Sequence, residues 1–180
     1  MKETITNPLV KDQVTFIKTT RETQGRVTEI EVVLSPGGGT PLHFHKDFTE
    51  QFIVLEGELS LQLGKKQVQT LGPGMGYTVQ KKEVHRFFNA TNNNVKFKTI
   101  IEPGSVGFEN SLRILYGLAG DNLTNDKGIP RDLISMAVIS NMSGMYLPGV
   151  FKLLTPLFNI LAGIGCRKGV DKQLLGKYCV

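Results

Sequence analysis

The chain has 180 residues, a length that fits a single domain with a substantial hydrophobic core. Hydrophobic residues make up 40% of it and charged residues 21%, with a formal net charge of +5, which is ordinary for a globular protein and excludes a disordered or fibrous chain. No basic segment followed by an apolar stretch opens the sequence, so we expect no signal peptide. Cys166 and Cys179 form no CxxC pair, and we expect reduced thiols and a cytoplasmic location.

The first two thirds of the chain carry the pattern of short β-strands. Aromatic and β-branched residues alternate with polar ones, and turn residues such as Pro73 and Gly74 separate the runs. The predicted strands cover 12–20, 25–35, two segments between 40 and 55 that break at 46–48, then 58–64, 66–72, 75–79, 84–88 and 94–104. Strands this short predict an antiparallel double-sheet β-barrel, which we place at residues 1–104.

From about Val106 the apolar residues recur at helical spacing. Helices are predicted over 107–119, 131–142, 147–165 and 170–178, with Pro130 as the first-turn proline of the second helix. We therefore expect residues 105–180 to form an α-helical C-terminal extension packed on the barrel, so that the chain is one structural domain overall.

All three histidines of the chain fall in one pattern. His43 and His45 alternate along a predicted strand and point to one face, Glu50 begins the next strand, and His85 stands on a later one. A lone histidine among apolar residues is more often a core or surface residue, but four such side chains converging from three strands favour a metal site. Three neutral imidazoles and one carboxylate suit Fe, Mn, Ni, Co or Zn, and an octahedral ion held this way keeps two open positions.

The same residues resemble the two sequence motifs of the cupin superfamily. The first motif, G(X)5HXH(X)3–4E(X)6G, is filled at every fixed position by Gly37, His43, His45, Glu50 and Gly57. The second motif, G(X)5PXG(X)2H(X)3N, is matched by Gly74, His85 and Asn89, whereas Gln80 and Lys82 stand where the family usually has Pro and Gly. The resemblance covers roughly residues 10–103. It implies a small antiparallel barrel of the jelly-roll type, with the metal ligands His43, His45, Glu50 and His85.

Apolar residues that share a face with the ligands define a predicted substrate pocket. By strand alternation Phe52, Val54 and Phe87 face the barrel interior, and Phe97 can join them. Each of the four, taken alone, is more often a core residue than a ligand contact. Together they predict a dry, apolar pocket for a small-molecule ligand that offers an oxygen atom to the metal.

Two classes of function stay open at this point. The resemblance to single-domain cupins similar to quercetin dioxygenases favours a metal-dependent oxygenase that acts on a small enolizable or phenolic compound, with Glu50 as the base. An isomerase or lyase that uses the metal as a Lewis acid is the alternative enzyme. The other class is a non-catalytic binding or sensing module. No helix-turn-helix precedes the barrel, and we expect no nucleic-acid partner.

The C-terminal extension combines an apolar stretch with positive charge. Residues 141–180 hold five basic residues against one acidic residue. The apolar residues that recur at helical spacing are Val150, Leu153, Leu154, Leu157, Phe158 and Leu161. We expect a helix that docks this stripe on the barrel or on a partner subunit; the alternative is an interfacial helix on an anionic membrane. We also expect a homodimer, because an open sheet leaves an edge that must be covered.

Overall fold

The β-strands occupy the first part of the chain and pair in antiparallel fashion throughout. The computed structural model describes residues 2–179. Its strands before the helices are β1 (Thr4–Asn7), β2 (Asp12–Lys18), β3 (Thr28–Leu34), β4 (Phe44–His45), β5 (Thr49–Glu56), β6 (Leu59–Leu63), β7 (Gln67–Leu71), β8 (Gly76–Val79), β9 (His85–Phe88) and β10 (Val95–Glu102). The prediction of a mainly β body with antiparallel sheets is therefore confirmed, and β1 is an addition that the sequence pattern did not predict.

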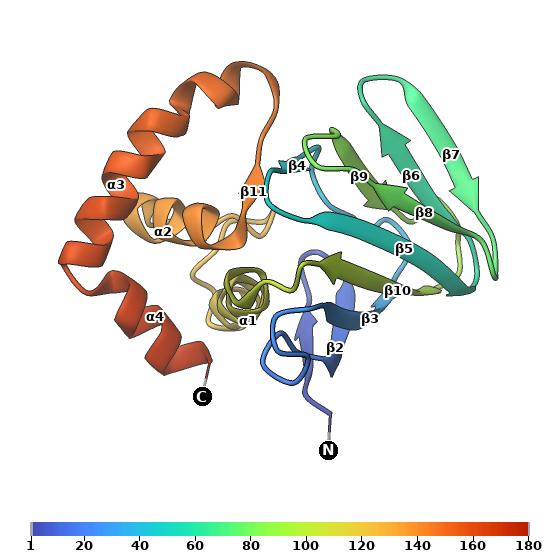
Figure 1. Cartoon of the computed structure of the whole chain (residues 1–180), viewed down its shortest axis with the longest axis horizontal. Helices are drawn as coiled ribbons and strands as arrows, with labels where there is room; N and C mark the ends of the chain where they lie inside the picture. The colour runs from blue at the N-terminus through green and yellow to red at the C-terminus, as the bar shows by residue number, and fades with distance from the viewer. Residues whose placement is uncertain (1, 180) are drawn as a thin grey trace.

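Two sheets face each other across the core. The larger sheet has six strands in the order β1-β2-β3-β10-β5-β8, and the smaller has three in the order β7-β6-β9 (Figure 1). A two-stranded ladder joins β4 to β11 (Met145–Tyr146), which comes from the C-terminal part of the chain. Among the described residues these ladders do not link into one continuous ring. The fold is thus two opposed sheets, and a closed barrel stays a prediction.

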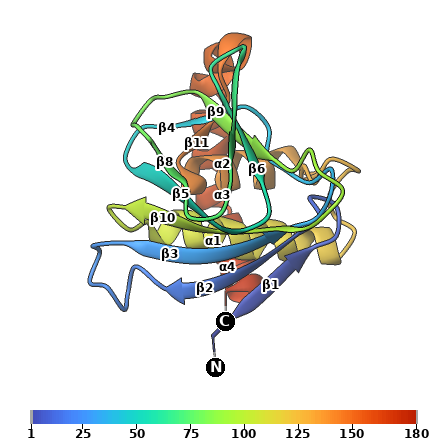
Figure 2. The same cartoon turned by 90° about the vertical axis from the view of Figure 1, so that its right-hand side faces the viewer.

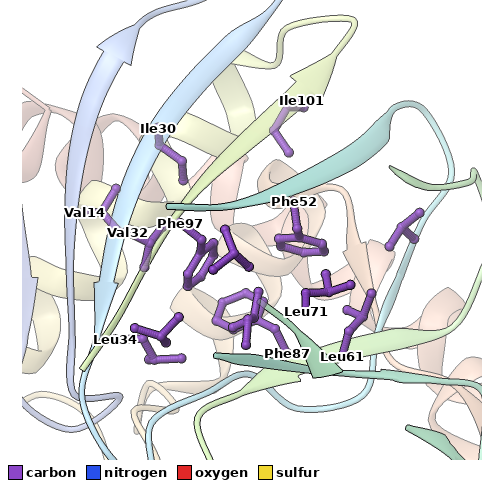
Figure 3. Packing of buried hydrophobic residues seen from close by; sticks show 14 of the residues in the cluster. Val14, Ile30, Val32, Leu34, Phe52, Leu61, Leu71, Phe87, Phe97 and Ile101 are labelled. Atoms are coloured by element: carbon purple, nitrogen blue, oxygen red, sulfur yellow. The ribbon is translucent and has the colours of Figure 1, made fainter. Parts of the chain in front are cut away.

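The core lies between the two sheets and is built by strand alternation. Phe52 and Phe97 come from the larger sheet and Phe87 from the smaller one, and their rings meet edge to face at centroid distances of 5.2 to 6.0 Å. Around them pack aliphatic side chains from both sheets, among them Val14, Ile30, Val32, Leu34, Leu61, Leu71 and Ile101 (Figure 3). Removing this much apolar surface from water is the main stabilising term of the fold.

The helices follow the last long strand, as their spacing predicts. They are α1 (Val106–Gly120), α2 (Leu133–Ser143), α3 (Thr155–Arg167) and α4 (Val170–Tyr178), with a 3-10 turn, η1 (Gly149–Leu154), before α3. Helix α2 begins at Leu133, two residues after the predicted start at residue 131, so Pro130 is not in its first turn. Asp132 caps this helix instead, since its carboxylate accepts a hydrogen bond from the backbone N–H of Ser135 at 2.7 Å.

Helix α1 completes the core at the β1–β2 end of the larger sheet. Phe108 and Tyr116 are buried in the same apolar cluster as the strand residues. The hydroxyl of Tyr116 donates a 2.6 Å hydrogen bond to the carboxylate of Asp12, and the guanidinium of Arg113 lies 4.1 Å above the ring of Phe16. Figure 2 shows α1 running beside the strands β3 and β10. This helix is therefore part of the same folded unit as the sheets.

Helix α3 packs on α2 and leaves its predicted apolar stripe exposed. Ala162 and Gly165 are its buried residues, and Gly165 lies against Ile134 and Val138 of α2. Of the predicted stripe, Leu153 in η1 and Leu157 in α3 are 80% and 50% exposed, Leu154 is also exposed, and Phe158 and Leu161 are half-buried. Ile160, which the prediction did not include, is 62% exposed. The stripe therefore does not dock on a sheet of its own chain; Val150, which belongs to the predicted stripe, lies outside the described side chains. Within the described residues, no helix is both long and apolar enough to cross a membrane.

Candidate metal centre

The strands that carry the predicted ligands are tied together by backbone hydrogen bonds. The N–H of His43 donates to the carbonyl of His85 at 2.9 Å, and the N–H of His85 donates to the carbonyl of His43 at 2.8 Å. His45 lies on β4, two residues after His43. Glu50 lies on β5, which pairs with β8 and β10. The sheet thus sets the positions of these four side chains before any ion is added.

The four side chains meet in one buried cluster. One ligand atom from each of His43, His45, Glu50 and His85 lies within 4.8 Å of the others, and none of the four residues is more than 4% exposed. The Oε2 atom of Glu50 is 3.2 Å from Nε2 of His45 and 2.9 Å from Nε2 of His85. Ligand atoms about 2.1 Å from one ion lie about 3.0 Å apart when adjacent and about 4.2 Å apart when opposite. The cluster therefore fits a single ion after a contraction of roughly 0.6 Å across its widest pair.

Each imidazole is oriented by its second ring nitrogen. Nδ1 of His43, His45 and His85 lies 2.8, 3.3 and 3.1 Å from the backbone carbonyl oxygens of Pro41, Gly144 and Glu83. A carbonyl oxygen only accepts, so Nδ1 is the N–H donor in all three rings. In a neutral imidazole the lone pair then sits on Nε2, the atom that points into the cluster. This is the arrangement in which histidines ligate metals.

The charges of the cluster suit a cation. Burial acts to raise the pKa of Glu50, but its hydrogen bonds to His45 and His85 outweigh burial and hold that pKa well below its ordinary value. Burial lowers the pKa of His43 to about 3, with the neighbouring His85 and His45 acting in the same direction. Because Nδ1 of His45 and His85 is committed to a carbonyl, the hydrogen bonds to Glu50 need a second proton on Nε2. In a neutral ring Nε2 would instead turn its lone pair toward the carboxylate, an unfavourable contact. A divalent cation at the centre removes this conflict, so the residues present fit a metal.

The predicted pocket residues are part of the apolar core next to the cluster. Phe52, Val54 and Phe97 are fully buried and Phe87 is 8% exposed. The ring of Phe52 lies 6.2 Å from that of His85, which links the aromatic cluster to the candidate metal centre. Their observed role is core packing, and contact with a substrate stays a prediction.

Two residues near the cluster were not found by sequence reasoning. The ring of Phe48 stacks on His45 at a centroid distance of 4.3 Å, and the carbonyl of Gly144 accepts the hydrogen bond from His45. Phe48 precedes Glu50 by two residues and so shares its side of the chain, which is a signal that alternation could have used. Gly144 is separated from His45 by 99 residues and carries no local signal of this contact.

Comparison with known proteins assigns the strand region to a family. Residues 30–101 match the family model described as the cupin domain. This segment, which holds all four clustered residues, therefore belongs to the cupin superfamily, as the motif resemblance predicts. A comparison with curated proteins gave no match.

Several solved structures are similar to about half of the chain. The polyketide cyclase RemF from Streptomyces resistomycificus has 26% identity and a TM-score of 0.47, over 51% of this chain and 65% of that one. A cupin-superfamily sugar phosphate isomerase from Silicibacter pomeroyi has 18% identity and a TM-score of 0.49, over 56% and 71%. The cupin domain of an XRE family transcriptional regulator from Enterobacter cloacae has 22% identity and a TM-score of 0.46, over 51% and 96%. The chain thus spans just under two thirds of the length of RemF.

Proposed function

We propose that the protein binds one divalent transition metal through His43, His45, Glu50 and His85 and is a metal-dependent oxygenase. The observation that carries the proposal is the cluster itself: four buried ligand atoms within 4.8 Å, with every Nδ1 already committed to a backbone carbonyl. The metal is one of Fe, Mn, Ni, Co or Zn, because imidazole and carboxylate ligands accept them all.

The proposed substrate is a small enolizable or phenolic compound. The surroundings of the cluster are apolar, since Phe48 and Phe52 both lie against its imidazoles, and burial excludes bulk water. Such a site favours a compact, partly apolar molecule that presents an oxygen atom. When bound, the ion would supply Lewis acidity and, for a redox-active metal, electron transfer to dioxygen.

Glu50 is the residue we propose as the base. Oε2 of Glu50 makes both contacts to histidine, and Oε1 makes neither of them. Oε1 would take the proton from the enolizable carbon or the phenolic hydroxyl, and binding of Oε2 to the ion would hold the carboxylate in place during the transfer.

The experiment measures metal content and oxygen uptake on the same preparations. The purified protein is expected to carry close to one equivalent of a divalent transition metal, and His43→Ala and His85→Ala to lose most of it. Oxygen consumption is then followed with enolizable and phenolic compounds after loading with Fe, Mn, Ni or Co. A full equivalent of metal in the double variant that combines His43→Ala with His85→Ala would overturn the site. Turnover of a compound without oxygen uptake would replace the oxygenase by an isomerase or lyase, and binding without turnover would indicate a sensing module.

We also propose that the protein is a homodimer. The edge strands β1 and β7 have a neighbour on one side only, and the exposed stripe of α3 adds apolar surface that a second copy would cover. Light scattering at micromolar concentration is expected to give twice the chain mass of 19.9 kDa. A mass of one chain would contradict this proposal.

A further inference from the structure

A short strand from the C-terminal part of the chain reaches the candidate metal centre. Helix α2 ends at Ser143, Gly144 adopts a left-handed conformation with φ 65°, and β11 follows at once. The strand β11 pairs with β4 so that Met145 lies opposite His45 and Tyr146 lies opposite Phe44. In Figure 1 this pairing is where the helical part of the chain meets the ligand-bearing strands.

Residues 144–146 contact the ring of the ligand His45 and also the residues before and after it in the chain. Its Nδ1 donates to the carbonyl of Gly144 at 3.3 Å. The ring of Tyr146 stacks on Phe44, the residue before His45, at a centroid distance of 5.6 Å. The ammonium of Lys46, the residue after His45, lies 3.7 Å above the same Tyr146 ring. The ring of Tyr146 therefore contacts the residues on both sides of His45.

The position of the Gly144 carbonyl has a chemical consequence. Gly144 directly follows α2, and its left-handed conformation turns the chain from the helix into β11. Its carbonyl accepts the hydrogen bond from the N–H of His45. A hydrogen bond of this kind fixes the ring and makes the other nitrogen a better electron donor to a metal.

His45 differs in this respect from the other two histidines. His43 and His85 donate to Pro41 and Glu83, each only two residues away, so their orientation is set within their own loops. The orientation of His45 depends on a segment 99 residues further along the chain.

From these contacts we infer that Gly144 and Tyr146 are positioning residues for His45 and that the C-terminal extension tunes the metal affinity of the cupin site. The inference rests on the proposed function, because it requires that the four clustered residues bind a metal. It assigns to the extension a role in metal binding and not only in stability.

The test compares cobalt(II) affinity, by competition with a chromophoric chelator, in five full-length proteins: the wild type, Tyr146→Ala, Tyr146→Phe, Tyr178→Ala and the ligand variant His43→Ala. Loss of an outer hydrogen bond to a metal-ligating histidine typically weakens binding by about 10- to 100-fold. Tyr146→Ala removes the contacts with Phe44 and Lys46 that hold the Gly144 carbonyl beside His45, so it is expected to bind about 10-fold more weakly than the wild type. Tyr146→Phe keeps the ring and is expected to bind within about twofold of the wild type.

The fourth protein is the matched control Tyr178→Ala. Tyr178 is a second tyrosine of the extension; it packs against Gly117 of α1 and its hydroxyl donates to Asp121, with no contact to His45. This variant is expected to lose thermal stability while binding cobalt(II) as the wild type does. Should Tyr146→Ala fail to fold, the exposed variant Lys46→Ala removes the contact between the Lys46 ammonium and the Tyr146 ring. Its cobalt(II) affinity is expected to fall by roughly two- to threefold.

The outcomes separate the inference from the proposed function. Equal affinity of Tyr146→Ala and the wild type, or an equal loss in Tyr146→Ala and Tyr178→Ala, would overturn the positioning role while leaving the metal site intact. Wild-type affinity no higher than that of His43→Ala would overturn the metal site, and the positioning role with it.

Discussion

The strand region and the helical region of this chain differ in how completely their apolar side chains are buried. In residues 4–102 the large side chains of both sheets, such as Phe52, Phe87 and Phe97, share one core. In the helical region α1 joins that core, but α3 packs only on other parts of the helical region, and Leu153 of η1 and Leu157 and Ile160 of α3 stay exposed. The strand region holds all four candidate ligands, and its core is completed by Phe108 and Tyr116 of α1. The helical region presents an exposed apolar surface that is available for contact with a partner molecule.

The largest effect is expected from opening the shared core. Phe97→Ala removes a fully buried ring that packs on Phe52 and Phe87, and we expect a loss of about 3–5 kcal/mol in the free energy of unfolding. The matched change at an exposed apolar position, Leu153→Ala, is expected to cost no more than about 0.5 kcal/mol. Urea unfolding of both variants gives the comparison. If Phe97→Ala instead left stability intact and abolished binding of a small molecule, Phe97 would line the predicted pocket.

A pH-dependent effect is expected where the two regions join. Asp12 on β2 is buried against Tyr116 of α1, and burial raises the pKa of its carboxyl group from 3.8 to about 6, although the hydrogen bond from Tyr116 acts in the opposite direction. The folded state therefore binds a proton that the unfolded state has released between about pH 4 and 6. Stability is expected to fall as the pH rises through this window, by about 3 kcal/mol in total.

The variant Asp12→Asn isolates this contribution. It keeps an oxygen acceptor for the hydroxyl of Tyr116 but cannot ionise. The difference between the unfolding free energies of wild type and variant is expected to change between pH 4 and 6 and to be constant above pH 7. Other groups that titrate in the window are present in both proteins and cancel. A difference that does not vary with pH would show that Asp12 has an ordinary pKa.

The smallest effect on stability, and the sharpest test of the exposed surface, concerns α3. Replacing Leu153, Leu157 and Ile160 together with serine is expected to change stability little, because these side chains make few contacts within the chain. The same triple variant is expected to lose whatever binds this face. Light scattering reports a lost homodimer, and flotation with anionic vesicles reports a lost membrane contact.

The control for the triple variant is Leu123→Ser, at a comparably exposed apolar position between α1 and α2. It should leave both readouts unchanged. Neither dimer nor vesicle binding in the wild type would mean that the exposed stripe has no partner of these two kinds.

The sequence predicted those features that depend on neighbouring residues. Alternation along strands predicted β2, β3, β5 and β10, and helical spacing predicted four helices, because both patterns are set by which face of an element is buried. The third helix was predicted from residue 147, but α3 begins at Thr155 after the 3-10 turn η1. His43, His45 and Glu50 lie within eight consecutive residues, so their convergence follows from local geometry, and only His85 required long-range pairing.

The missed features depend on contacts between distant segments. The strand β1 is four residues long, and only Ile5 among them packs on the core, which is too little for a periodic pattern. The strand β11 has two residues, and it exists because β4 pairs with it. The contact from His45 to Gly144 has the same origin, and no pattern of residue types within either segment reveals it.

The central claim is that one ion is held by the Nε2 atoms of His43, His45 and His85 and by the Glu50 carboxylate. The most direct test is a crystal structure of the zinc- or cobalt-loaded protein with anomalous diffraction recorded at the metal edge. The account predicts one anomalous peak per chain, about 2.0–2.3 Å from the three Nε2 atoms and from Oε2 of Glu50, with each Nδ1 still bonded to its carbonyl. A peak outside this cluster, or one ligated through Nδ1, would contradict it.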